Sequence, residues 1–255
     1  GVRYLDSVYD AVVNDEHFKV FKADFRYKNI VESLGPNRAS QFLQAAFAQS
    51  PELFYNELYS ERVRANDYIG APQVVKYAFP SGSAVSGENA MVERETGCSV
   101  VRYVKVVSDL HLMMDVLKDP SIQSIAEIGI GFGGQAQVLL SHPAISPPPG
   151  TGPGRVVDYY FFDIPIVRQL AAKYLSKFPW LDQHRLHFMD SDWDTVGPDT
   201  DAVFDLCISS YAVSEFSVDL QDRYIATVLK RCRRGYILYN TIGEDELGSY
   251  TVEQF

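Results

Sequence analysis

Four glycines in one short segment mark the part of the sequence best suited to hold a ligand. The segment reads Glu127-Ile-Gly129-Ile-Gly131-Phe-Gly133-Gly134 and follows an apolar run typical of a buried strand. Glycine lets a backbone turn sharply and approach a ligand closely, where a Cβ atom would collide. Gly129, Gly131 and Gly134 match the dinucleotide pattern GxGxxG, while Gly129, Gly131 and Gly133 match GxGxG, a pattern of S-adenosylmethionine (SAM) sites.

Two acidic residues help to decide whether the predicted cofactor is a dinucleotide or SAM. Glu127 lies two residues before the first glycine, where a carboxylate favours an ammonium group and opposes a pyrophosphate. Dinucleotide folds place a ribose-binding acid about 20 residues after the turn, whereas the acid at the end of the next predicted strand is Asp163, 34 residues after Gly129. A proline-rich excursion accounts for the extra length, so the spacing opposes NAD only mildly. Glu127 therefore decides the prediction in favour of SAM.

Further polar residues follow the predicted strands. Asp163 is expected to bind the ribose diol, and Asp190 and Ser191, after the third strand, the adenine amino group. Ligands of open α/β sheets bind at the carboxyl ends of strands, where these residues would meet. In a simpler interpretation, Asp163 only caps a helix and Asp190 a turn. The predicted cofactor-binding residues are Arg102, Glu127, Gly129, Gly131, Gly133, Asp163, Ile164, Asp190, Ser191 and Ser209.

The pattern of apolar residues changes near residue 120. Residues 1–119 have helical spacing and are predicted to form an N-terminal helical cap or substrate region, with a long loop over 71–98. Residues 120–255 alternate short apolar runs with helical stretches, which predicts an α/β domain with right-handed crossovers. The fold class is a doubly wound, mostly parallel sheet behind a helical cap. The helices of the α/β domain are expected at 134–140, 165–178 and 218–232.

Composition excludes several function classes. The 255 residues carry 23 basic and 33 acidic side chains, a net charge of −10, so nucleic acid is excluded as a partner. No run reaches the roughly 18 apolar residues that cross a bilayer, so no membrane contact is expected. Three distant cysteines oppose a disulfide framework and indicate a cytoplasmic protein. Asp190, Asp192 and Asp194 form a D-x-D-x-D run, interpreted as a solvated acidic loop without a metal.

Several segments together resemble class I SAM-dependent methyltransferases and, across most of the chain, the sugar O-methyltransferase family. They are 102–105, 127–135, 161–165, 209–216 and 240–243. The resemblance implies SAM as cofactor and methyl transfer to a hydroxyl of a saccharide or glycoside. Folds of this class add strands after the fifth, and 14 residues follow Thr241. Residues outside this chain, or a partner such as a second copy in a homodimer, are therefore expected to complete the sheet.

The candidate catalytic residues are Glu215 and Tyr211. A sugar hydroxyl needs a general base near the methyl group, and Glu215 follows the fourth predicted strand. Alternatively, Ser214 and Glu215 begin the next helix. Tyr211 is expected to stack on a sugar or orient its hydroxyls, and Arg102 to pair with the SAM carboxylate; packing and surface roles are the alternatives. An NAD(P)-linked oxidoreductase and a non-catalytic scaffold remain as other functions.

Overall fold

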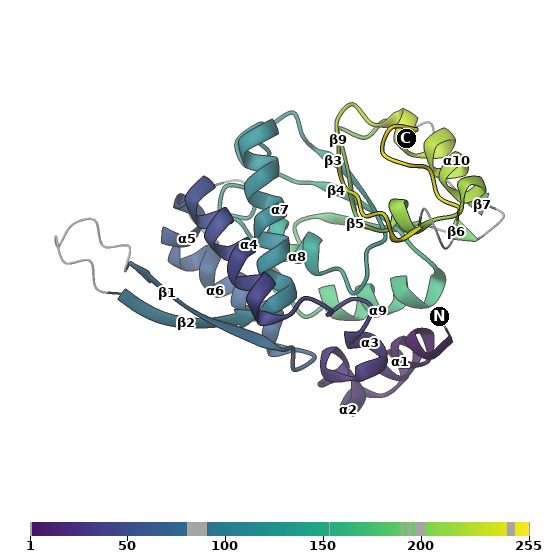
Figure 1. Ribbon diagram of the computed structural model, residues 1–255. Coiled ribbons are helices and arrows are strands. Elements are labelled where there is room, and N and C mark those ends of the chain that lie inside the picture. Colours follow the sequence, from purple (N-terminus) through teal and green to yellow (C-terminus); the bar gives the residue numbers. More distant parts are fainter. Residues whose placement is uncertain are drawn as a thin grey trace. The chain divides into compact units, whose positions relative to one another are not determined.

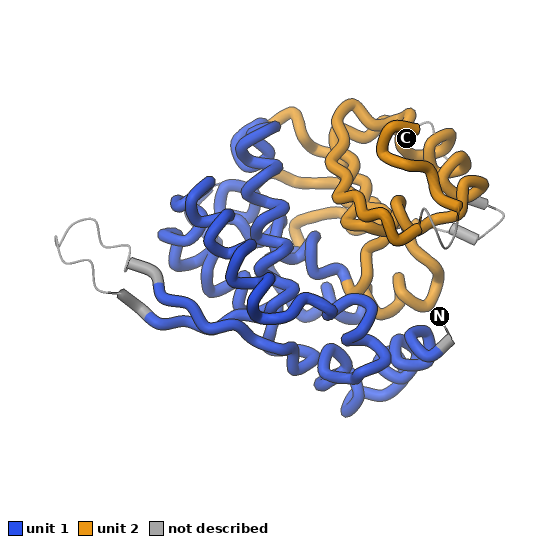
Figure 2. The backbone as a smooth tube through the Cα atoms, viewed as in Figure 1, with its two compact units in different colours: residues 1–119, 133–154, 173–181 blue, residues 120–132, 155–172, 182–255 orange. Residues whose placement is uncertain are grey.

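A computed structural model describes most of the chain and divides it into two compact units (Figures 1 and 2). The described residues are 2–80, 91–152, 154–189, 191–192, 195–196, 202–243 and 248–254. Unit 1 comprises residues 1–119, 133–154 and 173–181, and unit 2 comprises residues 120–132, 155–172 and 182–255. The first change of unit therefore falls at residue 120, and two later segments return to unit 1.

Unit 1 is mainly helical. Its core contains α4 packed on α7, where Ala39 and Leu43 of α4 meet Cys98 and Val101 of α7. The left-handed residue Asp115, with φ of 50°, follows the last turn of α7. Short 3-10 helices lie at Phe21–Ala23, Asn66–Tyr68 (η2) and Pro179–Leu181 (η3). The α-helices are α1 (Val2–Val13), α2 (Asp15–Phe18), α3 (Phe25–Lys28), α4 (Pro36–Gln49), α5 (Glu52–Tyr55), α6 (Glu57–Ala65), α7 (Cys98–Met114) and α8 (Gly134–Leu140).

The prediction of a loop over 71–98 is wrong for residues 74–80 and 91–97, and residues 81–90 of that range lie outside the described residues. β1 (Val74–Pro80) and β2 (Met91–Gly97) pair antiparallel as a hairpin that extends beyond the helices of unit 1 (Figure 1). Val75 is buried in the same core cluster as α4, while the exposed Lys76 forms an ion pair with Glu95 at 3.1 Å. This alternation is the strand period of two. Most of the Gly and Ser residues that suggested a loop lie between the two strands in the sequence, whereas Pro80 and Gly97 are the last residues of β1 and β2.

Unit 2 contains a five-stranded parallel sheet, which confirms the α/β class. The strands are β3 (Ser124–Ile128), β4 (Asp158–Phe162), β5 (Arg185–Met189), β8 (Leu206–Ser210) and β9 (Gly235–Leu238). Their order is β5-β4-β3-β8-β9, so the chain moves outward from β3 in one direction and then returns to build on its other side. Such a reversal, here between β3 and β8, is the topological switch of doubly wound sheets.

Helices and a short ribbon connect these strands. α9 (Pro165–Leu175) leads from β4 to β5, and α10 (Val218–Thr227) with η5 (Leu229–Arg231) leads from β8 to β9. The predicted helix starts at 165 and 218 are therefore correct, although both helices end earlier than expected. β6 (Ser191–Asp192) and β7 (Thr195–Val196) pair as a two-residue ribbon.

One face of the sheet is covered by α10 and the segment before it. Ala126, Ile128 and Phe162 alternate with residues of the opposite face and form a buried cluster with Val213 and Tyr224. Nearly continuous apolar strands are expected where a parallel sheet is covered on both faces. Glu127 projects from the other face of β3, since successive side chains along a strand alternate.

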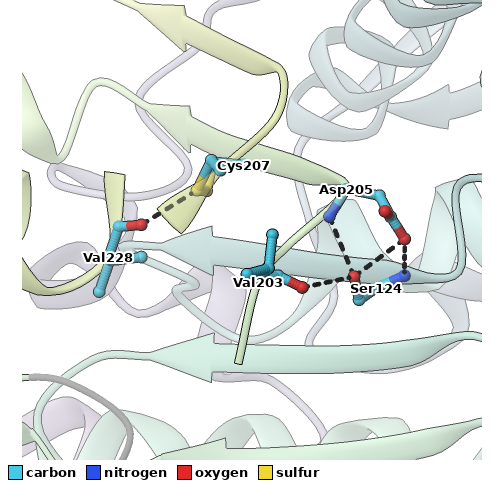
Figure 3. Close-up of a disulfide and its surroundings, with 6 residues drawn as sticks. Ser124, Val203, Asp205, Cys207 and Val228 are labelled. Carbon is cyan, nitrogen blue, oxygen red and sulfur yellow. Dashed lines mark hydrogen bonds between the residues drawn. A yellow bond between two sulfur atoms is a disulfide. The ribbon is translucent and has the colours of Figure 1, made fainter. Parts of the chain in front are cut away.

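A disulfide joins Cys207 of β8 to Cys232, although the sparse cysteines opposed a disulfide framework (Figure 3). Their Cα atoms are 5.9 Å apart, within the range that a disulfide spans. The two residues are 25 positions apart in the sequence, and only the pairing of β8 with β9 brings them together. Nearby, at the amino ends of β3 and β8, the Asp205 carboxylate accepts hydrogen bonds from the Ser124 N–H and hydroxyl, both at 2.9 Å (Figure 3).

Neither a membrane-spanning helix nor a metal-binding cluster is present within the described ranges. No described helix combines the length and apolar character needed to cross a bilayer. No group of three or more His, Cys, Asp or Glu side chains of the described residues is placed to hold a metal. Two acids of the D-x-D-x-D run, Asp190 and Asp194, lie outside the described residues.

Candidate functional site

The glycine turn connects β3 to α8 in a conformation that requires glycine. Gly129, Gly131 and Gly133 have φ angles of 76°, 52° and 86°, in the left-handed region that L-residues with side chains rarely adopt. A Cβ atom on Gly129 would overlap the Cβ of Ala212, which follows β8. The first glycine is therefore needed both for backbone conformation and for close packing between the β3 and β8 loops at the topological switch.

The side chain of Asp163, at the end of β4, stabilises this turn by accepting hydrogen bonds from backbone N–H groups. Its Oδ2 accepts a hydrogen bond from the Ile130 N–H at 2.9 Å, and its Oδ1 accepts one from the Ile164 N–H at 2.8 Å. Burial raises the pKa of Asp163 to about 6, and backbone N–H groups, including that of Gly131, oppose this rise. Asp163 is therefore mostly ionised at neutral pH, and it lies beside the turn as predicted for a ribose-binding acid.

Glu127 is a buried acid beside the turn. Its side chain is 3% exposed, and its Oε2 accepts a hydrogen bond of 2.7 Å from the hydroxyl of the fully buried Tyr159. Within the described part of the chain, Oε1 accepts no hydrogen bond. Burial raises the pKa of Glu127 to about 8, and the charge of Asp163 adds to the rise. The acid is thus mainly protonated at neutral pH, and a cation placed at Oε1 would favour its ionised form.

The predicted residues of β8 stabilise the same edge of the sheet. The buried Ser209 hydroxyl donates to the Ile128 carbonyl at 3.1 Å and accepts from the Val213 N–H at 3.2 Å. Its described contacts thus tie the end of β3 to the segment after β8. Tyr211 is half-buried and has a φ of 73°, a strained conformation for a residue with a side chain. Such strain is often found at functional sites.

Glu215 lies on the 3-10 helix η4 (Val213–Glu215), exposed to solvent. Asn240, which follows β9, donates from Nδ2 to Oε1 of Glu215 at 2.7 Å. Asn240 is itself held at two more points: its Oδ1 accepts from the Ile242 N–H at 3.1 Å and its N–H donates to the Ser214 hydroxyl at 3.3 Å. Because an N–H must face the amide oxygen, the amide nitrogen is directed at Glu215.

For three predicted residues the described contacts do not test the predicted role. Arg102 belongs to α7 in unit 1, where it donates to the Val31 carbonyl at 3.4 Å and lies over the Tyr103 ring at 5.4 Å. Ser191 is described only as backbone of the β6 ribbon, and Asp190 falls outside the described residues. The roles proposed for these three residues toward a cofactor stay predictions.

The carboxyl edge of the sheet therefore carries two groups of polar residues. Glu127 and Asp163 adjoin the turn after β3, and Tyr211 and Glu215 follow β8. Sequence reasoning assigned no role to Tyr159, Ala212 or Asn240. For Asn240 a signal was available, since a polar residue directly after the fifth strand must lie at this same edge.

The known proteins to which this chain is similar share little sequence identity with it. No family model matches the sequence, and no curated protein matches it. Structurally similar proteins include a cyclopropane-fatty-acyl-phospholipid synthase-like protein from Lactobacillus casei (17% identity over 56% of this chain and 51% of that one; TM-score 0.35). Others are human N-acetylserotonin methyltransferase in complex with SAM (13%, 82% and 48%; 0.32) and mitomycin 7-O-methyltransferase (12%, 82% and 55%; 0.34).

This chain aligns with about half the length of those three proteins. At such identities and TM-scores the similarity supports no conclusion about activity or substrate. The function of this chain has to be argued from its own residues.

Proposed function

We propose that SAM binds at the carboxyl ends of β3, β4 and β8 and that the protein is a SAM-dependent O-methyltransferase. One observation carries the proposal: a buried carboxyl group, Glu127, lies next to a glycine turn and leaves Oε1 without a hydrogen bond from the described residues. A cation at Oε1 would favour the ionised form of Glu127, and that carboxylate suits a ligand with an ammonium group and opposes a ligand with a pyrophosphate. SAM carries an ammonium group, whereas NAD carries a pyrophosphate.

The residues present fit the cofactor. Glu127 would hold the amino group, and Asp163 would accept hydrogen bonds from the ribose hydroxyls. The turn at Gly129 and Gly131 supplies a backbone surface without side chains. When bound, SAM supplies a methyl group made electrophilic by the sulfonium sulfur. Unit 2 fixes these groups before binding, because the turn is held by Asp163 and by the contact of Gly129 with Ala212.

Glu215 is proposed as the general base of the acceptor side. It follows β8 at the topological switch, and its exposed carboxylate is free to approach an acceptor hydroxyl from solvent. The hydroxyl proton would pass to Glu215, and Asn240 would keep the carboxylate in one orientation through its 2.7 Å hydrogen bond. Tyr211 would position the acceptor from the same loop. Asn240 is thus a positioning residue, and Glu215 the catalytic one.

A saccharide or glycoside is proposed as the acceptor. The support is the resemblance of segments 209–216 and 240–243 to the sugar O-methyltransferase family, and these segments carry the Glu215–Asn240 contact. A base is needed most for such acceptors, because aliphatic hydroxyls are weakly acidic and poor nucleophiles near neutral pH.

Two binding measurements and one activity measurement test the proposal. Calorimetry should show saturable binding of S-adenosylhomocysteine (SAH) to the intact protein, and NADH fluorescence should not change on mixing. Transfer of labelled methyl from SAM to a panel of saccharides should then be detected and should fall strongly in Glu215→Gln. NADH binding without SAH binding would favour the oxidoreductase, and SAH binding without transfer to any acceptor would favour a non-catalytic scaffold.

A further inference from the structure

Unit 1 contains a cavity of about 460 Å³ that the proposed reaction does not use. It lies between α6 and η2 on one side and the end of α9 with η3 on the other. Its walls are apolar and aromatic, formed by side chains that include Leu58, Tyr68, Ile69, Phe178 and Trp180. Tyr68 is 75% exposed despite being aromatic, so it offers a ring to an incoming ligand. The volume is in the range of small-molecule sites, roughly 300–1,000 Å³.

A buried cation lines this apolar cavity. Arg62 is 7% exposed, and its guanidinium lies over the Trp180 ring at 5.3 Å. Its Nη1 donates to the carbonyls of Ser141, at 3.2 Å, and Ser146. Within the described part of the chain, no carboxylate pairs with Arg62, and its Nε and Nη2 make no hydrogen bond. A buried guanidinium normally has an anionic partner, so these donors are an unused site for an anion.

The charges around the cavity define the ligand further. Lys177, exposed on the rim, adds a second cation, and Glu61, also on the rim, adds one negative charge. Two cations and one anion favour a ligand with a single negative charge over a doubly charged phosphate. The aromatic walls favour a flat, apolar body over a polar one.

We propose that this cavity binds an aromatic carboxylate, with its carboxylate at Arg62 and Lys177 and its ring against Trp180 and Phe178. The planar guanidinium of Arg62 presents donors in the fork geometry that matches a carboxylate. None of the residues that line it belongs to the site proposed for SAM, and all of them are part of unit 1. The protein would thus have a second ligand site of its own.

Calorimetric titration of the full chain with naphthoate tests this site. Binding should be saturable, with one naphthoate per chain, and at least tenfold tighter than that of naphthyl methanol, which has the ring but no charge. In a Trp193→Phe background, Trp180 is the only remaining tryptophan of the sequence, and its fluorescence should change with the same midpoint. Absence of saturable binding, or equal affinity for the alcohol, would overturn the proposal.

Variants locate the ligand and separate this proposal from the methyltransferase. Lys177→Met, at an exposed position, should weaken naphthoate binding about three- to tenfold and leave SAH binding unchanged. Arg62→Met should weaken it at least tenfold, while Arg64→Met, a matched control on the same helix outside the cavity lining, should not. If Arg62→Met does not fold, Arg62→Lys, which retains the charge but loses the fork, should still lower the affinity. An equal loss in Arg64→Met, or no loss in Lys177→Met and Arg62→Lys, would contradict the assignment.

Discussion

Glu127→Gln isolates the charge that the proposed cofactor site depends on. The substitution keeps the size of the side chain and an oxygen that accepts the hydrogen bond from Tyr159. The substitution removes only the ability of this side chain to carry a negative charge. In the free protein the pKa of Glu127 is about 8, well above its ordinary 4.5, because burial penalises the charged form. Binding of an ammonium group should therefore drive a proton off Glu127.

The magnitude follows from that pKa. At pH 7, one unit below it, ionising Glu127 costs about 1.4 kcal/mol, whereas at pH 8 the cost falls to about 0.4 kcal/mol. A hydrogen bond to a charged group contributes about 1.5–3 kcal/mol. SAH should thus bind the wild type at most about fifteenfold more tightly than Glu127→Gln at pH 7, since about 1.6 kcal/mol remains. The ratio should grow about fivefold between pH 7 and pH 8, and wild-type binding at pH 7 should release about 0.9 proton.

The pH dependence of the free energy of unfolding, measured without ligand, is a second test, and the raised pKa of Glu127 determines its direction. Between pH 4.5 and 8 the unfolded chain has lost the Glu127 proton while the folded protein retains it, so the free energy of unfolding falls as pH rises. Burial raises the pKa of Asp163 to about 6, which adds a fall of the same sign between pH 3.8 and 6. Glu127→Gln should reduce the fall of the melting temperature between pH 4.5 and 8, most cleanly above pH 6, where Asp163 no longer contributes.

The assay is calorimetry of SAH in two buffers with different ionisation enthalpies, which counts released protons. The control ligand is methylthioadenosine, which has the same nucleoside and thioether but no amino-acid group; its affinity should be the same for both proteins at both pH values. Unchanged SAH affinity and unchanged proton release in Glu127→Gln would refute the reasoning. So would an equal loss for methylthioadenosine, because that would show a general disturbance of the site.

Four further substitutions test other parts of the site. Gly129→Val should abolish SAH binding and lower the melting temperature, because a side chain there collides with Ala212; normal binding in a thermal-shift assay would contradict the packing argument. Asp163→Asn should weaken both SAH and methylthioadenosine at least tenfold by calorimetry, since it removes the proposed ribose acceptor. Asn240→Ser should lower kcat about threefold to tenfold with SAH affinity unchanged, whereas Glu215→Gln should lower kcat further; if Glu215→Gln turns over normally, Glu215 is not the base.

Much of unit 2 could be predicted because local sequence determines it. β3, β4 and β5 are short runs of apolar, β-branched and aromatic residues, and α8 begins at Gly134 as expected. The strand ends at Ile128 and Phe162 identify the carboxyl edge of the sheet, which is why Glu127 and Asp163 could be assigned to one site. The alternation of strands with helices was sufficient to predict a parallel sheet.

Features that depend on pairing between distant segments could not be predicted in this way. The parallel register pairs Glu127 of β3 with Phe161 of β4. Tyr159 lies two residues before Phe161, so its side chain is on the same face of the sheet and reaches Glu127. The Cys207–Cys232 disulfide depends on the pairing of β8 with β9. The β1–β2 hairpin was missed because its strands, half-buried on one face, are separated by a segment with loop composition.

A crystal structure of the protein with SAH tests the central claim most directly. The account predicts the amino group of SAH within hydrogen-bonding distance of Glu127 Oε1, the ribose hydroxyls at Asp163, and the thioether sulfur on the side of β8 that carries Tyr211 and Glu215. If SAH is absent from this site under saturating conditions, or is bound with its amino group away from Glu127, the account is contradicted.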